Sequence, residues 1–306
     1  MTQSIIKIET YLNNLDEVYA MASLTAGLDT SSEWIRNFNG SPTVQIASID
    51  MDGLGTTDRN GELVEGDVNL TWNDYVLTQD RNRKFYVDKI DNIESLEMAF
   101  GKLSSEFMRR KVVKEMDAYR FAKYAAGAGT TVEATIASSS AALSALNTAE
   151  STMFNADVDI AGCKLFCRHS FYGYIRDSIT FERRPDGAGI LRDIEIFDKM
   201  EVIVVPEDRF YSSITMLDGK TAGQTAGGYT NAGKIIEFMI VDPNAVDQTV
   251  VQEMERFFAP NKNLMSQSGA DGVCEKRDAW SFDYRLYHDA FVRDNATDGV
   301  YLQTKT

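Results

Sequence analysis

The most concentrated group of reactive side chains comprises Cys163, Cys167 and His169, which form a C-x-x-x-C-x-H pattern. Thiolates and imidazoles are common ligands of zinc, but a structural zinc site takes four ligands. No second pair of cysteines lies nearby, because the remaining cysteine is Cys274. Alternation along a β-strand explains the same spacing, so we expect no metal site here.

Acid–base and nucleophilic catalysis have few candidates. The chain has two histidines, and His288 stands inside an alternating aromatic segment, as expected of a core or interface residue. No G-x-S-x-G segment presents a serine nucleophile. The glycines near positions 127 and 223 to 228 lack the Lys-Ser/Thr pair of a phosphate-binding loop. We therefore expect no catalytic residue and no cofactor, and a soluble enzyme is the least favoured class.

Composition and charge exclude further classes of function. The 306 residues are 43% hydrophobic and 25% charged, which is ordinary for a globular protein. A net charge of -15 argues against a general surface for nucleic-acid binding, which requires basic groups. The sequence has neither an apolar run of about 18 residues nor a secretory signal, so we expect no membrane association. Three cysteines suit synthesis in a reducing cytoplasm.

The elements that must position any functional group begin with an extended region. Residues 1–43 carry little apolar density and predict an N-terminal arm. Residues 44–91 show two strand-like runs around a stretch rich in Gly and Asp, which predicts a long hairpin. An isolated two-stranded ribbon is marginal in water, so a partner surface is expected.

The charges of this hairpin are unevenly distributed. Six acids and one arginine lie between Asp50 and Asp67. Basic residues dominate the segment from Asp80 to Lys89. The sequence thus predicts one acidic and one basic arm, whose opposite charges would set the register between subunits.

Residues 93–126 predict one exceptionally long helix. Apolar residues recur at three-four spacing from Ile93 to Phe107 and re-phase through Val112 towards Tyr119. No proline interrupts the pattern before Gly127, so the helix would have about 34 residues and a length of about 50 Å. A coiled coil is disfavoured, because basic residues occupy positions 110 and 111, where its seam would be apolar.

The remainder mixes short helices and strands, and the fold class is therefore α+β. Expected helices cover residues 139–154, 170–179 and 244–257, the last with Glu253 and Glu255 on a solvated face. Expected strands cover residues 163–167, 202–205, 235–241, 280–292 and 300–302, with a loop at 218–233. The strand at 280–292 is expected to pack under the long helix.

This order of elements resembles that of a Hong Kong 97-like major capsid protein of tailed phages. Several segments are also similar in texture to that family: LTQDRNRKFYVD at 77–88, MAFGKL at 98–103, DAYRFAKY at 117–124, VVPEDRF at 204–210, FMIVDP at 238–243 and WSFDYRLYHD at 280–289. The likeness covers roughly residues 40 to 306. None of these segments has catalytic content, and their shared order makes the match specific.

The resemblance implies the Hong Kong 97-like capsid fold. Residues 1–43 would form the N-arm, and 44–91 an extended β-hairpin loop (E-loop) over the adjacent subunit. Residues 92–136 would belong to a peripheral domain with the spine helix, and 137–240 mostly to an axial domain with parts returning to the peripheral domain. Residues 241–306 would form the return to the peripheral domain and the C-terminal strands.

The same resemblance implies a function. The chain would assemble into hexamers and pentamers of the icosahedral head shell that encloses the dsDNA genome of a tailed bacteriophage. It would be made in the host cytoplasm and reside in the virion, with a separate scaffolding protein, a portal protein, decoration proteins and weakly contacted DNA as partners. An encapsulin-like nanocompartment shell is the alternative. The residues expected between subunits are Trp72, Tyr75, Arg81, Arg83, Lys84, Arg109, Arg110 and Lys114.

Overall fold

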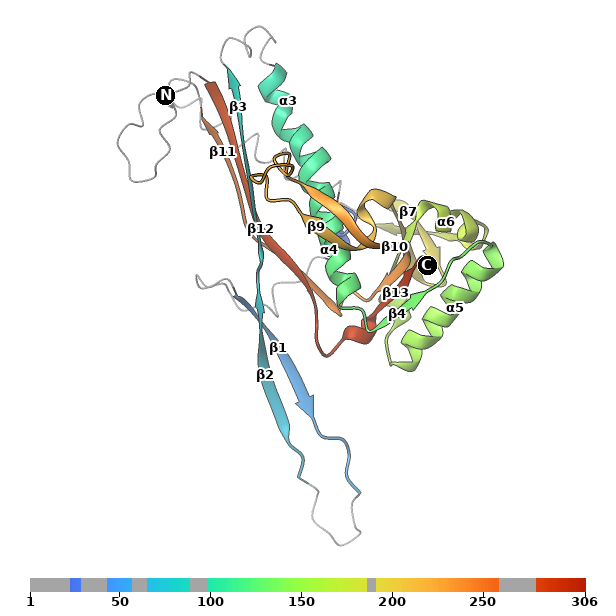
Figure 1. Ribbon diagram of the computed structural model, residues 1–306. Helices are drawn as coiled ribbons and strands as arrows, with labels where there is room; N and C mark the ends of the chain where they lie inside the picture. Colours follow the sequence, from blue (N-terminus) through green and yellow to red (C-terminus); the bar gives the residue numbers. More distant parts are fainter. Residues whose placement is uncertain (1–22, 29–42, 57–64, 89–97, 186–190, 259–278) are drawn as a thin grey trace.

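A computed structural model describes residues 23–28, 43–56, 65–88, 98–185, 191–258 and 279–306. Figure 1 shows three parts: a two-stranded hairpin that projects from the molecule, a long helix beside a three-stranded sheet, and a body in which a larger sheet carries two further helices. Most of the predicted N-terminal arm, the start of the predicted long helix and Cys274 lie outside the described residues.

The elements follow one another in this order. The helices are α3 (Met98–Phe107), the π-helical turn η3 (Met108–Val112), α4 (Val113–Ala126), α5 (Ser139–Asn155) and α6 (His169–Ile175). The short 3-10 turns are η1 (Ala26–Leu28), η4 (Ile160–Gly162), η5 (Arg176–Ser178), η6 (Glu207–Arg209) and η7 (Thr297–Gly299). The strands are β1 (Thr43–Met51), β2 (Val68–Val76), β3 (Gln79–Asp88), β4 (Thr130–Glu133), β5 (Lys164–Arg168), β6 (Thr180–Pro185), β7 (Leu191–Phe197), β8 (Met200–Val205), β9 (Tyr211–Met216), β10 (Tyr229–Val241), β11 (Val246–Phe258), β12 (Ala279–Val292) and β13 (Val300–Thr304).

The body sheet is buried on both faces. Its strands run in the order β4-β13-β10-β5-β8-β7-β6, and β9 also pairs with β10. Along β10, Phe238 and Ile240 pack in the core shared with α5 and α6, whereas Met239 and Val241 pack in the core shared with α4. Alternate residues of one strand therefore fill two cores, which explains why this segment is apolar without interruption.

The long helix joins the two sheets. Met108, Val112 and Met116 pack against Phe282 and its neighbours in the sheet of order β11-β12-β3. The C-terminal half of α4 covers the body sheet. From Met98 to Ala126 the helix spans about 43 Å, which confirms a long helix over the described residues and its packing on the strand at 280–292.

The predicted re-phasing of the helix has a structural basis. The stripe keeps four-residue spacing from Leu103 to Phe107 and again from Met108 to Met116, so it shifts by one residue where the π-helical turn η3 begins. A π turn accommodates one more residue than an α turn, so it restores the alignment of the stripe with the sheet.

The predicted long hairpin is shorter than expected. The run expected as one strand at 69–90 divides at Leu77 and Thr78: β2 pairs with β1, but β3 pairs with β12. The side chain of Leu77 is buried with Tyr75 and two aromatic residues of β12, and this contact fixes the division. The projecting ribbon is therefore the acidic part, while the basic segment lies in the three-stranded sheet.

The prediction of a helix at residues 244–257 is wrong, because the strand β11 occupies this segment. Its residues pair with β12 from Val246 to Phe258, with one irregularity between Val250 and Gln252. Pairing with a long neighbouring strand overrides the weak helical spacing of the apolar residues. Glu253 accordingly lies on a strand, where it accepts a hydrogen bond of 2.8 Å from the hydroxyl of Tyr284.

The other expected elements are confirmed with small changes. The helix at 139–154 and the strands at 163–167, 202–205 and 280–292 match α5, β5, β8 and β12 within two residues. Strand β10 begins at Tyr229 and shortens the loop expected at 218–233. The helix expected at 170–179 is α6 followed by η5.

The carboxyl group of Glu150 in α5 predicts how the stability of the body depends on pH. Burial, together with the neighbouring Asp198 in the turn from β7 to β8, raises the pKa of Glu150 to about 7 from its ordinary value of 4.5. The folded state thus holds a proton that the unfolded chain releases, so stability from this group is present below pH 4.5 and is lost as the pH rises through 7.

Glu150→Gln is expected to stabilise the protein at pH 8 by less than about 1 kcal/mol, because solvent partly screens this half-buried group. At pH 4, where the carboxyl is protonated in both states, the variant should match the parent. Urea titrations at both pH values measure the difference. An equal change in stability at the two values would contradict the raised pKa.

Candidate assembly surface and its anchors

The two cysteines of the predicted cluster lie in a packed core, whereas His169 is exposed. Cys163 and Cys167 are buried between the body sheet and the helices α5 and α6. Burial raises the pKa of each thiol to about 12, so both are protonated at neutral pH and are poor ligands and nucleophiles. His169 begins α6 and stacks on Tyr172. Within the described ranges, no three His, Cys, Asp or Glu side chains gather to hold a metal ion.

His288 is buried in β12, with 1% of its surface exposed. Burial lowers the pKa of its imidazole to about 3, and the ring packs edge-to-face on Tyr119 with centroids 5.5 Å apart. The imidazole is therefore neutral, and its burial agrees with its expected place in the core.

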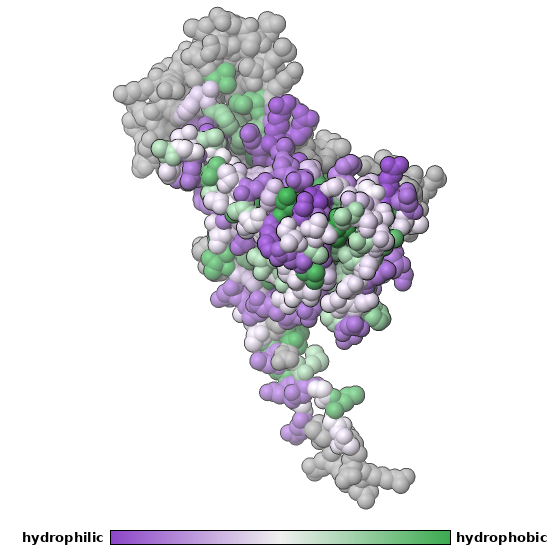
Figure 2. Space-filling view, turned by 45° about the vertical axis from the view of Figure 1, so that its right-hand side comes forward, coloured by the Kyte–Doolittle hydropathy of each residue, from purple (hydrophilic) through white to green (hydrophobic). Residues whose placement is uncertain are grey.

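The hairpin β1-β2 exposes an apolar face. Ile49 lies opposite Leu70 and Met51 lies opposite Val68, so these four side chains and Trp72 share one face of the ribbon. Between 39% and 67% of each of these residues is exposed. Figure 2 shows hydrophobic residues on the stalk that extends below the body. We call these five residues the apolar hairpin face.

The basic residues of β3 bind within their own chain. Arg81 forms an ion pair with Glu115 at 2.7 Å and donates hydrogen bonds to the carbonyls of Leu217 and Gly228 at 2.8 and 3.2 Å. Arg83 donates from two nitrogens to the carbonyl of Thr225, each at 3.2 Å. The two arginines thus hold the loop between β9 and β10 against the three-stranded sheet.

Three other residues expected between subunits, Lys84, Arg109 and Arg110, have fewer described contacts within the chain. Lys84 lies 3.6 Å from Asp283. Arg109 and Arg110 pair with Glu106 on the same helix, and they are 57% and 70% exposed. Contact of any of these residues with another subunit stays a prediction.

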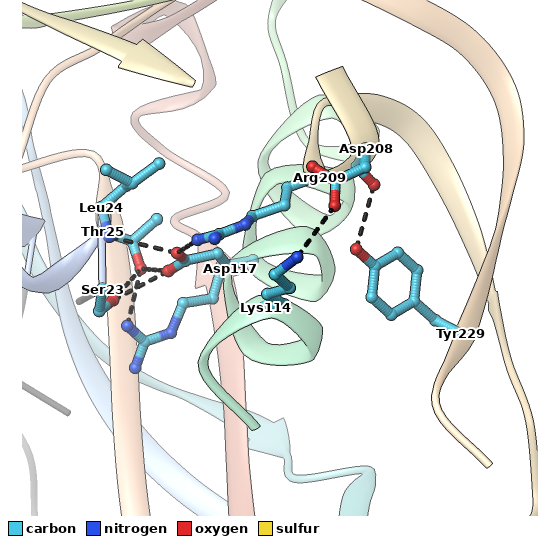
Figure 3. Close-up of polar contacts among 9 residues, drawn as sticks. Ser23, Leu24, Thr25, Lys114, Asp117, Asp208, Arg209 and Tyr229 are labelled. Carbon is cyan, nitrogen blue, oxygen red and sulfur yellow. Dashed lines mark hydrogen bonds and ion pairs between the residues drawn. The ribbon is translucent and has the colours of Figure 1, made fainter. Parts of the chain in front are cut away.

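Tyr75 and Lys114 also have contacts inside the subunit. The ring of Tyr75 packs on Phe291 with centroids 5.0 Å apart, at the base of the hairpin. Lys114 lies 3.6 Å from Asp208, whose backbone carbonyl accepts a hydrogen bond from Tyr229 (Figure 3). The structure therefore does not bring the predicted residues into one cluster: Trp72 is on the hairpin, and the others lie at its base, on β3 and along the helix.

A buried carboxylate on α4 anchors residues 23–28, which belong to the predicted N-terminal arm. Asp117 accepts hydrogen bonds from the hydroxyl of Ser23 at 2.8 Å, the amide of Leu24 at 3.2 Å and the hydroxyl of Thr25 at 3.0 Å (Figure 3). Arg209 donates at 3.1 Å to Oδ2 of the carboxylate, which also accepts from Leu24. The carboxylate has no exposed surface.

Thr25 accepts two further hydrogen bonds, from the long helix and from the three-stranded sheet. Its hydroxyl accepts a hydrogen bond from Arg120 at 2.9 Å, and its carbonyl accepts one from Gln248 of β11 at 2.6 Å. Leu28, one turn later, is buried in the core beneath α4. This short segment is therefore fixed by the long helix and by the sheet.

A second buried carboxylate anchors the base of the hairpin. Asp289 of β12 has no exposed surface, and its Oδ2 accepts hydrogen bonds from the amide and the hydroxyl of Thr78 at 2.8 and 2.9 Å. Its Oδ1 accepts from the hydroxyl of Tyr119 at 2.7 Å. Burial raises the pKa of that phenol, which remains a hydrogen-bond donor at neutral pH.

Sequence reasoning did not identify Asp117, Asp289, Thr25 or Thr78. The two acids themselves carry no local signal, because other charged residues stand close to each of them in the sequence. Their partners have no local signal, since Ser23 is 94 residues from Asp117 and Thr78 is 211 residues from Asp289.

Comparisons at the level of sequence find no relative. No family model matches the chain, and no curated protein is similar to it. Of the helices in the described part of the chain, none has both the length and the apolar character needed to cross a bilayer.

Solved structures, in contrast, match over nearly the whole chain. A chain from the capsid structure of cyanophage P-SCSP1u matches 91% of this chain and 86% of its own length, with a TM-score of 0.57 and 11% identity. A chain from the mature capsid of bacteriophage PhiM1 matches 91% and 90%, with a TM-score of 0.60 and 10% identity. A structure of Gordonia phage Cozz matches 93% and 86%, with a TM-score of 0.59 and 12% identity. The chain therefore has the α+β fold of these phage capsid structures, as its resemblance to the capsid family implied.

Proposed function

We propose that this chain is the major capsid protein of a tailed bacteriophage, and that it assembles into hexamers and pentamers of the icosahedral shell around the dsDNA genome. The observation that carries the proposal is the projecting hairpin on a fold shared with phage capsid chains. A two-stranded ribbon gains little stability by itself, and its exposed apolar face calls for a partner.

The partner we propose for the apolar hairpin face is a second copy of this chain. A shell repeats one contact many times, and an arm that reaches over a neighbour enlarges the interface without a larger core. The hairpin is acidic, whereas Arg109 and Arg110 are exposed on the long helix. We propose that this basic surface faces the acidic hairpin of the neighbouring copy.

Further partners follow from this function. A scaffolding protein, a portal protein and decoration proteins would meet the shell, and the chain would reach the virion after assembly in the host cytoplasm. The packaged DNA would be contacted weakly, because a net charge of -15 disfavours adhesion to phosphate.

The proposal is tested by expressing the chain in a bacterial cytoplasm and imaging the purified product by electron microscopy. We expect hexamers, pentamers or closed shells, because the apolar hairpin face is covered only between copies. Sedimentation that shows monomers at every concentration would contradict the proposal. Shells that enclose a protein cargo instead of accepting DNA would favour the nanocompartment alternative.

A further inference from the structure

The hairpin leaves the molecule through a short and well-defined base. Val76 ends β2, Gln79 begins β3, and only Leu77 and Thr78 lie between them. Leu77 is 4% exposed, and its carbonyl accepts a hydrogen bond of 3.3 Å from Tyr287. The two residues therefore form the joint between the projecting ribbon and the three-stranded sheet.

The carboxylate of Asp289 binds this joint to the centre of the subunit. Its Oδ2 holds the amide and the hydroxyl of Thr78, while its Oδ1 accepts from Tyr119 of α4 and from the amide of Ala290 at 2.8 Å. Lys123 of α4 lies 3.9 Å from Oδ1. One side chain thus connects the hairpin base, the long helix and β12.

We propose that Asp289 is a positioning residue for assembly, which sets the direction in which the hairpin leaves the subunit. This inference rests on the proposed function, because the direction matters where the hairpin must reach a neighbouring copy. A ribbon of nine-residue strands amplifies a small rotation at its base into a large displacement at its tip.

The chemistry of the site requires a carboxylate rather than an amide. Each oxygen of Asp289 accepts from a backbone N–H, that of Thr78 on one side and that of Ala290 on the other. An asparagine has one oxygen and one NH₂ group, so either orientation would place a donor against a donor. Asp289→Asn therefore disrupts the joint while nearly preserving the volume of the side chain.

The test measures the direction of the hairpin separately from assembly. Spin labels are placed at Met51→Cys on the ribbon and Phe154→Cys on α5, which are 65% and 70% exposed, with Cys274 replaced by Ser. Cys163 and Cys167 are buried and escape labelling. In unassembled subunits, Asp289→Asn is expected to broaden and shift the distance distribution, and Thr78→Val is expected to do so to a smaller degree.

Asp74→Asn is the matched control, because Asp74 lies on the exposed ribbon, where its carboxylate accepts a hydrogen bond of 2.7 Å from the side-chain amide of Gln45. Its distribution should match that of the parent. In electron micrographs, Asp289→Asn should give malformed or open assemblies while circular dichroism shows a folded subunit.

Thr78→Val keeps the test valid if Asp289→Asn does not fold. Unchanged distributions in the variants that fold would overturn the inference. Failure of the parent to assemble would instead contradict the proposed function, while the distances would still report on the joint.

Discussion

Replacing Ile49 and Leu70 together by Asp is expected to abolish shell formation and to leave the subunit folded. The two residues lie opposite each other on the apolar hairpin face, and each is about half exposed in the subunit. Their replacement therefore removes nothing from the core. In an interface, however, each new carboxylate would lose its water, which costs several kcal/mol per group. Electron microscopy and light scattering measure the loss of shells.

Asn73→Asp provides the control on the other face of the same strand. Successive residues of a strand point to opposite sides, so Asn73 does not share the face of Leu70 and Trp72. This variant adds one negative charge, where the double variant adds two, and it should still assemble. Replacing residues 44–75 by two glycines is a stronger form of the test, because Thr43 pairs with Val76 and a tight turn can connect them. If the Ile49→Asp, Leu70→Asp variant or the variant without residues 44–75 formed shells of normal size, the hairpin would not be the contact between subunits.

Asp117→Ala is expected to lower the free energy of unfolding by about 3–5 kcal/mol, the usual range when one partner of a buried ion pair is removed. Arg209 would lose its carboxylate, and the hydroxyls of Ser23 and Thr25 would lose their acceptor. Urea titrations in the Ile49→Asp, Leu70→Asp background measure the change without interference from assembly.

Asp208→Ala is the matched control for that experiment. Asp208 lies near the same helix and pairs with Lys114 at 3.6 Å, but both side chains are about half exposed. Its removal should cost about 0–1 kcal/mol, as for other surface ion pairs. A loss at Asp117 no larger than that at Asp208 would mean that the buried cluster contributes little.

Periodic apolar patterns made much of the fold predictable. The long helix, the strand at 280–292 and the α5 segment each repeat over several turns or strand residues, so burial on one face fixes their type. The order of these elements then led to the capsid resemblance, and the solved structures confirm the fold.

The errors occurred where partners distant in the sequence decide the outcome. β11 is a strand because β12 pairs with it, and β3 separates from the hairpin because it pairs with β12. Arg81 and Arg83 bind carbonyls of a loop about 140 residues later, while their contact with another subunit stays a prediction. No local pattern encodes such contacts, and the same holds for the anchors at Asp117 and Asp289.

The pairing of β3 with β12 also determines when, during folding, the hairpin gains its support. It joins Gln79 to His288 and Asp88 to Ala279, so the sheet that supports the hairpin closes only across some two hundred residues of chain. Contacts so remote in sequence form slowly, because the entropy of closing the loop must be overcome first. The Thr78–Asp289 joint lies beside this pairing and can form only with it. Folding is therefore expected to delay the display of a directed arm until the rest of the subunit is in place. In the proposed shell, partly folded chains would lack the arm that contacts a neighbour.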